Sequence, residues 1–277
     1  MQALIGKLFV MKKVLVILLS TILVLQSCEF KLKPFDIVEG DQQKLEVCRY
    51  DRLESQYLTT SDFSALQQMN TDYPMETRTL IENMLKIGEV DDPEINNKFL
   101  SFYQDSVLQT MISDAESKYA NIDDINLEFN KAFDNLKKIV PNIPVPMIYM
   151  QIGALDQSII IGNGTIGISI DKYLGENYPL YKKYYPVAQR ITMNRENIVP
   201  DAMCFYIMSQ YPMKNFEKRP QRDKDLHVGK IMWLCNRILE KKCFATPYVS
   251  VVDRYICSHR DINIASFIKS DDYRCFK

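Results

Sequence analysis

The sequence predicts a mostly helical α+β fold, with a helical N-terminal half, a small antiparallel β-hairpin or sheet around residues 147–170, and a helical C-terminal half. Apolar residues recur at helical spacing before residue 140 and again after Ile198, and runs of β-branched residues flank Gly162-Asn163-Gly164. The 277 residues are 47% hydrophobic and 25% charged, which is enough for a large core and excludes disorder as the main state.

Helical signals in the N-terminal half begin after residue 60. Asp72 before Pro74, and Asp92 before Pro93, each place a capping acid beside a proline that suits a first helical turn. We expect three helices, from Asp72, from Asp92 and from about Asp124, and the last two have apolar stripes that pack together as core. The first stripe contains Phe99, Leu100, Tyr103, Val107, Leu108 and Met111, and the second contains Phe129, Phe133, Leu136 and Val140.

The chain changes character at the three prolines of residues 141–146, which cannot continue a helix. The segments MIYMQIG and SIIIGNGTIGISI follow, and Gly162-Asn163-Gly164 within the second predicts a tight hairpin turn. Residues 162–167 also resemble part of a glycine-rich phosphate loop, but this stretch joins strand to strand instead of opening a helix, so we predict no nucleotide binding.

The C-terminal half returns to helical patterns. One helix is expected from near Ile198 to Pro212, and a strongly apolar one from about Asp223 to Glu240, followed by two shorter helical segments.

A targeting signal opens the chain. Lys12 and Lys13 precede a mostly apolar run of twelve residues, Val14 to Leu25, which is too short to cross a bilayer core of about 30 Å but typical of a signal peptide. The run ends in Leu25-Gln26-Ser27-Cys28, which resembles the lipobox of bacterial lipoproteins. We therefore expect a signal peptide over residues 1–27, a tether lipidated at Cys28 over residues 28–60, and one globular domain over residues 61–277. An ordinary secretory signal or a short membrane anchor is the alternative.

Charge and cysteine content fit export. The whole chain has a net charge of −1; without the three lysines of residues 1–27 it has 31 basic and 35 acidic residues, a net charge of −4, which argues against nucleic-acid binding. Six cysteines remain besides Cys28, and four of them lie in the last 43 residues. We expect at least one local disulfide there, with buried free thiols as the alternative.

The residues for metal or nucleophilic catalysis are scarce. The chain contains two histidines, His227 and His259, and no H-E-x-x-H, C-x-x-C or G-x-S-x-G motif. Cys257-x-His259 is a weak metal signal on its own. We therefore predict no catalytic residue, no metal and no cofactor.

Four motifs occur in an order that resembles the GldB family of gliding-motility lipoproteins. They are GISIDKYLG at 167–175, YPLY at 178–181, IVPDAM at 198–203 and HVGKIMW at 227–233. The departures at His227 and Val228, and the end of the chain soon after Cys275, would make this a divergent or shortened member. The positions that match family motifs are Asp171, Tyr173, Gly175, Pro200, Asp201, Gly229 and Lys230.

The resemblance implies a lipoprotein of the Gram-negative envelope, associated with the motility machinery and the secretion system it depends on. We expect a non-catalytic protein that binds envelope proteins near Asp171, Tyr173 and Asp201. The membrane contact would be the acylated cysteine, and Glu29 favours the outer membrane, facing the periplasm. A more distant resemblance to zinc peptidases of the H-E-x-x-H type leaves a metal-independent or degenerate peptidase, or a peptide-binding protein, as the alternative, because the helix PDAMCFYIM lacks the ligands.

Overall fold

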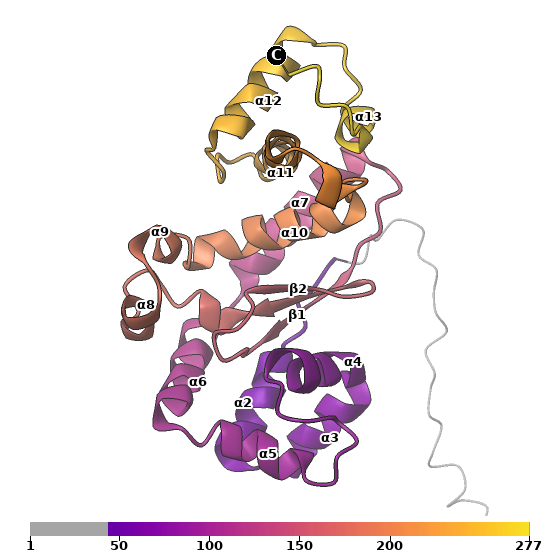
Figure 1. Cartoon of the computed structure of the whole chain (residues 1–277). Helices are drawn as coiled ribbons and strands as arrows, with labels where there is room; N and C mark the ends of the chain where they lie inside the picture. Colours follow the sequence, from indigo (N-terminus) through magenta and orange to yellow (C-terminus); the bar gives the residue numbers. More distant parts are fainter. Residues whose placement is uncertain (1–43, 277) are drawn as a thin grey trace, which may run out of the picture. The chain divides into compact units, whose positions relative to one another are not determined.

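A computed structural model describes residues 44–276, so the predicted signal peptide, Cys28 and the predicted tether up to residue 43 lie outside the described residues. From Lys44 onward the chain forms one unit with the predicted mostly helical α+β architecture (Figure 1). The elements of its first half are α2 (Tyr50–Thr60), α3 (Phe63–Asp72), α4 (Pro74–Arg78), the π-helical turn η1 (Thr79–Met84), α5 (Ile95–Phe102), α6 (Ser106–Lys118) and α7 (Asp123–Ile139).

The folded part begins earlier than the predicted domain start at residue 61. Residues 44–48 are extended, as expected of a lead-in, and Asn130 of α7 binds both the N–H of Leu45 (2.8 Å) and its carbonyl (2.7 Å). Helix α2 then starts at Tyr50, inside the range assigned to the tether. Half of the residues that α2 buries are polar, so its inner face lacks the apolar pattern that marks a helix in sequence.

The single helix expected from Asp92 is two helices. The Asp105 carboxylate accepts a hydrogen bond from the N–H of Val107 (2.7 Å) and starts α6, after a turn that ends α5. Val107, which the continuous stripe placed in the core, is 46% exposed, whereas Phe99 and Met111 are buried as predicted.

The sheet is mixed, with strand order β1-β3-β2. Its strands are β1 (Met147–Gln151), β2 (Ile159–Ile161) and β3 (Thr165–Ser169). The predicted hairpin is confirmed, because β2 and β3 are antiparallel around Gly162–Gly164. Strand β1, however, pairs with β3 in parallel, because β3 returns between β1 and β2. The prediction of an antiparallel sheet was therefore wrong for the pairing of β1.

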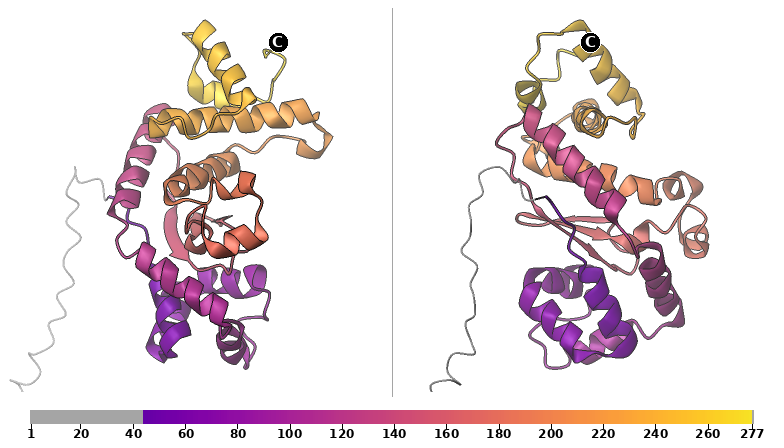
Figure 2. Two further views of the ribbon diagram at one scale, coloured as in Figure 1. Left: turned by 90° about the vertical axis from the view of Figure 1, so that its left-hand side faces the viewer. Right: turned by 180° about the vertical axis from the view of Figure 1, so that it is seen from behind.

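Helices cover both faces of the sheet. Helix α2 packs beneath β1, and α10 and α7 lie above the sheet, with α10 against β2 and β3 (Figure 1). The long helix α11 crosses α10 and α7 and carries α12 on its outer side, as both views of Figure 2 show. The C-terminal elements are η2 (Ile170–Lys172), α8 (Pro179–Tyr184), α9 (Val187–Arg190), η3 (Arg195–Asn197), α10 (Ile198–Gln210), η4 (Phe216–Lys218), α11 (Gln221–Leu239), α12 (Pro247–Ser258) and α13 (Ile264–Lys269).

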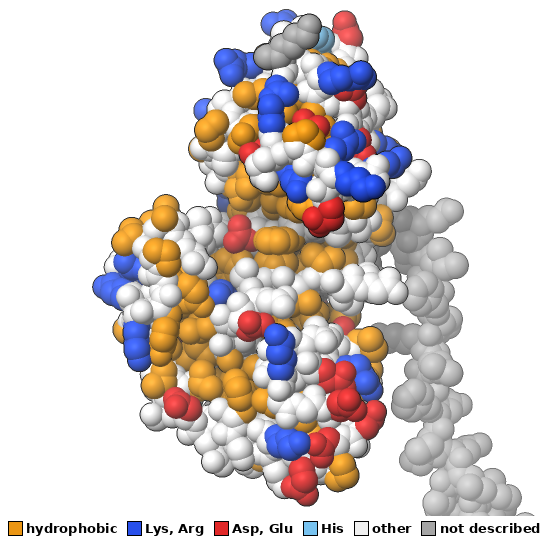
Figure 3. All heavy atoms as spheres, in the orientation of Figure 1, with side chains coloured by type: hydrophobic (Ala, Val, Ile, Leu, Met, Phe, Trp, Pro, Cys, Tyr) orange, Lys and Arg blue, Asp and Glu red, His pale blue; other side chains and the backbone are white. Residues whose placement is uncertain are grey.

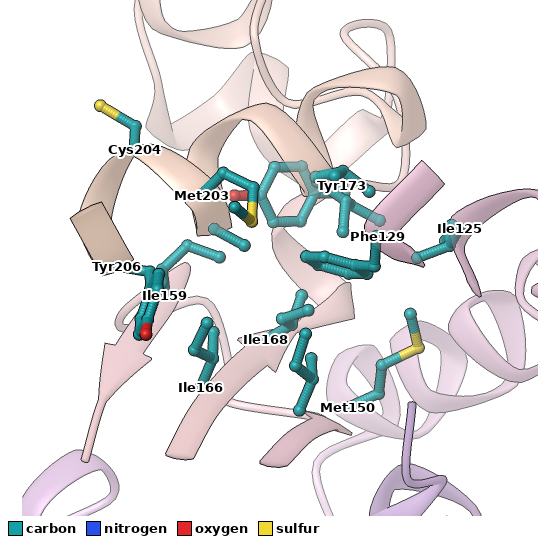
Figure 4. Packing of buried hydrophobic residues seen from close by; sticks show 14 of the residues in the cluster. Ile125, Phe129, Met150, Ile159, Ile166, Ile168, Tyr173, Met203, Cys204 and Tyr206 are labelled. Atoms are coloured by element: carbon teal, nitrogen blue, oxygen red, sulfur yellow. The ribbon is translucent and has the colours of Figure 1, made fainter. Parts of the chain in front are cut away.

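One apolar core joins the sheet to the helices above it. Phe129 of α7 and Met203 of α10 point toward Ile168 of β3 and its neighbours (Figure 4), and all three side chains are fully buried. Burial of this kind supplies about 1.5–3 kcal/mol for each large apolar side chain.

The prediction of a disulfide near the C-terminus was wrong, because all six cysteines of the described residues are free. Side chains of α11 hold this end instead. The Lys230 ammonium donates to the carbonyls of Phe267 (3.1 Å) and Ser270 (2.5 Å), and His227 Nδ1 lies 2.8 Å from the Tyr273 hydroxyl.

Candidate functional site

Tyr173 and Asp201 form a direct pair above the carboxyl end of β3. The Tyr173 hydroxyl donates to Oδ2 of Asp201 at 2.9 Å. Tyr119, the residue after α6, fixes the backbone by donating from its hydroxyl to the Tyr173 carbonyl at 2.6 Å. Tyr173 follows η2, and Asp201 lies in the first turn of α10, so the pair joins two segments that are 28 residues apart. Figure 4 shows Tyr173 beside Met203, which lies on α10 together with Asp201.

Burial sets the proton affinity of this pair. Removal from water raises the pKa of Asp201 to about 6, although the hydrogen bond from Tyr173 acts in the opposite direction. Burial also raises the pKa of the Tyr173 hydroxyl, with Asp201 adding to the effect. Asp201 therefore changes charge near pH 6, while its carboxylate is held by the Tyr173 hydroxyl.

Asp171 lies only two residues from Tyr173 but serves a different segment. Its carboxylate accepts hydrogen bonds from the N–H groups of Gly153 (2.8 Å) and Leu155 (2.6 Å), in the loop after β1. Ala154 and Leu155 have φ of 48° and 64°, the left-handed region that side chains disfavour, so the carboxylate holds a strained turn. Burial raises the pKa of Asp171, and these two N–H groups oppose the shift.

Gly175 and Pro200 shape the segments that carry the pair. Gly175 has φ of +117°, and its N–H donates to the carbonyl of Met193 at 2.9 Å, which turns the chain from Tyr173 toward α8. Pro200 is buried in the first turn of α10, where a missing N–H is tolerated.

Gly229 and Lys230 lie apart from this pair, on α11. A Cβ added to Gly229 would lie 2.8 Å from the Cβ of Tyr248, so the glycine permits close approach of α11 and α12. Lys230 holds the C-terminal segment, and burial lowers its pKa to about 8. The family motifs thus divide into a group around Tyr173 and Asp201 and a group that packs the C-terminal helices.

One face of α10 is left open to solvent beside this pair. Asp201, Phe205 and Met208 lie at positions i, i+4 and i+7 and share that face. Phe205 is 47% exposed, whereas Asp201 and Met208 are half-buried. On the opposite face Met203 and Ile207 are fully buried. In Figure 3 the β2–β3 hairpin crosses the front of the molecule as a white ridge, which is backbone and uncharged polar side chains, between areas of hydrophobic side chains.

A second polar group, absent from the predicted site residues, lies beneath the sheet. Glu54 of α2 is fully buried, and its Oε2 accepts from the N–H of Ile152 at 2.8 Å, whereas no described residue bonds to its Oε1. Burial raises the pKa of Glu54 well above its ordinary value, the Ile152 N–H opposes this, and nearby Asp171 and Asp51 add to it. The signal in the sequence is the helical spacing of Tyr50, Glu54 and Tyr57. Because Glu54 is charged, these three positions do not form an apolar stripe and the helix was not predicted.

The weak metal signal at Cys257-x-His259 gains no support from its surroundings. Both residues are exposed at the end of α12, where the His259 ring stacks on Tyr255. Within residues 44–276, no group of three or more histidine, cysteine or acidic side chains is arranged to hold a metal ion. No helix in the same range is both long enough and apolar enough to cross a membrane.

The family model described as gliding motility protein GldB matches residues 36–245. The chain belongs to the GldB family. It is therefore a lipoprotein of the gliding-motility type, and the match includes all seven of the motif positions predicted from the sequence. No curated protein and no solved structure gave a match.

The GldB match includes both motif groups. It covers the whole sheet, α10 and α11, and ends before α12 and α13. The Tyr173–Asp201 pair and the open face of α10 therefore lie within the part of the chain that the family model describes.

Proposed function

We propose that this GldB-family chain is a lipid-anchored envelope protein that acts by binding proteins of the motility or secretion machinery, and that it is not a catalyst. The observation that carries the proposal is the exposed Phe205 on a helix whose opposite face is buried. An exposed aromatic side chain beside a fixed polar pair is the composition that protein interfaces favour.

The buried polar groups that hold the segments next to α10 support a binding role. Hydrogen bonds within the chain hold the side chains of Tyr173, Tyr119 and Asp171, so these residues fix the segments beneath the surface. Asp201 adds a carboxyl group that can be neutral or charged near pH 6. A partner would thus meet an apolar face with one titratable group at its end.

The anchor in this proposal is Cys28, acylated and joined to the folded unit through the residues before Lys44. Two or three acyl chains give stable membrane attachment, whereas a single chain binds only marginally. The outer membrane, with the folded unit facing the periplasm, is the location we propose.

Photo-crosslinking in intact envelopes tests the interaction. With a benzophenone amino acid in place of Phe205, we expect one or a few discrete crosslinked products. The same amino acid in place of Leu127, a 72%-exposed apolar residue of α7, is the matched control. Identical diffuse products from both positions would refute the proposed binding surface.

A degenerate, metal-independent peptidase is a second candidate, because an Asp201 pKa of about 6 beside a tyrosine hydroxyl suits general acid and base chemistry. Hydrolysis of unfolded casein by the purified chain, abolished in Asp201→Asn, would establish this activity. An equal absence of turnover in both proteins would leave the binding role.

A further inference from the structure

The two edges of the sheet differ in how they are covered. At the β1 edge, Cys48 of the lead-in donates to the Ile148 carbonyl (2.8 Å) and accepts from the N–H of Met150 (3.0 Å). Strand β2 forms the other edge, since the strand order is β1-β3-β2. The chain therefore closes one edge with its own backbone and leaves β2 as the outer strand.

The register of the hairpin shows which backbone groups of β2 face outward. The Ser158 carbonyl accepts from Ser169, and the Gly162 N–H donates to Thr165, both at 3.0 Å. Because bonding alternates along an antiparallel pair, the N–H and C=O groups of Ile159 and Ile161 point away from β3. No hydrogen bond from the described residues reaches these four groups.

This edge is protected only by its short length, because its sequence carries none of the residues that block pairing at exposed strands. Such strands usually carry a lysine, a proline or an inward-pointing charge, whereas β2 is three consecutive isoleucines. Ile160 and Ile161 are only half-buried, and the hairpin ridge lies open in Figure 3.

We infer that an extended segment of a partner protein binds this chain by adding a strand to the free edge of β2. The inference rests on the proposed binding function and specifies its mode. Two N–H and two C=O groups spaced two residues apart are complementary to an extended backbone. Ile159 packs toward α10 (Figure 4), so alternate side chains of an added strand would face α10, and apolar residues are expected there.

A second copy of the chain is a poorer occupant than a partner segment. A stable dimer needs roughly 1,200 Å² of buried surface or more, and a three-residue edge offers only a small part of that area. A partner segment can instead extend along α10, where Phe205 is exposed.

The test compares Ile161→Pro with Ile161→Ala in the full lipidated chain. Both variants lose the isoleucine side chain, but only proline removes the outward N–H, and neither breaks a bond to β3. The probe is a displayed library of random ten-residue peptides, selected on the unsubstituted chain. We expect peptides with alternating apolar residues whose affinity falls about tenfold more in Ile161→Pro than in Ile161→Ala.

Hydrogen exchange on the unsubstituted chain keeps the inference testable if the proline variant unfolds. The selected peptide should slow exchange of the Ile159 and Ile161 amides. Failure to select any peptide, equal affinity of the two variants, or protection confined to other elements would overturn strand addition. A discrete crosslink from position 205 that persists in Ile161→Pro would also overturn it, while leaving the proposed binding function intact.

Discussion

At the residue scale, Asp171, Tyr173 and Asp201 show how burial gives different roles to nearby polar groups. Asp171 and Tyr173 are close in sequence, but their side chains leave the tight turn of η2 in different directions. One carboxylate binds backbone N–H groups and holds a loop, whereas the other shares a hydrogen bond with Tyr173. The sequence could identify the three residues but not divide them in this way.

Removal of the Tyr173 hydroxyl should raise the pKa of Asp201 above about 6, since the hydroxyl stabilises the charged form. The pKa of Asp201 is about 6 in the folded chain and 3.8 as its ordinary value, so the folded chain binds this proton more tightly than the unfolded chain. The resulting stabilisation of the folded state is complete below pH 3.8 and is lost as the pH rises through about 6. Tyr173→Phe should also cost about 1–3 kcal/mol at neutral pH. Carboxyl NMR titration and urea unfolding measure the two effects. Tyr184→Phe, which changes an exposed tyrosine, is the control and should alter neither quantity. An unchanged titration of Asp201 in Tyr173→Phe would contradict the role of the Tyr173 hydroxyl.

Glu54 should make the chain less stable as pH rises. Its folded pKa is raised, so its contribution is complete below its ordinary pKa of 4.5 and declines as pH rises through the folded value. Glu54→Gln keeps an acceptor for Ile152 and removes the charge, so we expect a flatter pH dependence and at least equal stability at pH 7. Urea unfolding from pH 4 to 8 tests this, with exposed Glu89→Gln as the control. Parallel curves for wild type and Glu54→Gln would show that the side chain is not held protonated.

At the element scale, local signals predicted the helices and the hairpin, and non-local contacts decided the rest. The stripe of α7 and the Gly-Asn-Gly turn were sufficient by themselves. Helix α2 was missed because its buried face includes Asp51, Glu54 and Ser55. The parallel pairing of β1, and therefore the free edge of β2, depends on where β3 inserts, which no local pattern encodes.

The lead-in should depend on α7 for its position. Asn130 binds both backbone groups of Leu45, and Asn126 accepts from the N–H of Val47 at 2.9 Å. Asn130→Ala should cost about 1–3 kcal/mol and speed amide exchange at Leu45. Urea unfolding and hydrogen exchange measure these changes, and exposed Asn83→Ala is the control. Unchanged exchange at Leu45 would mean that β1 alone holds the lead-in.

Contact between α11 and α12 should not tolerate a side chain at Gly229. A new Cβ would lie 2.8 Å from the Cβ of Tyr248 and 3.1 Å from its backbone carbonyl carbon, so a helix must shift. Gly229→Ala should cost about 1–3 kcal/mol through overpacking, despite a helix-propensity gain of about 1 kcal/mol. Thermal unfolding measures the loss. Tyr248→Ala retains the Cβ and should not rescue stability, and rescue would place the strain in the aromatic ring instead.

At the scale of the whole molecule, attachment and recognition would use opposite edges of one sheet. The chain enters through residues 44–48 along β1, pinned by α7, and the strand left free is β2. A pull on the tether would therefore reach the sheet directly, and a partner strand added at β2 would be connected to the anchor through three hydrogen-bonded strands. Such a continuous set of hydrogen-bonded strands would suit a protein that connects a membrane anchor to a partner protein.

This arrangement requires that attachment reside in Cys28. The signal-like segment ends at that residue, and an acylated cysteine with two or three chains binds membranes stably. Cys28→Ala should move the chain from the membrane fraction to the soluble fraction and abolish incorporation of labelled palmitate. Cys48→Ala, which changes a cysteine of the lead-in, should leave both unchanged. Membrane fractionation of Cys28→Ala identical to wild type would show that another contact holds the protein at the membrane, and the sheet would then carry no load from the tether.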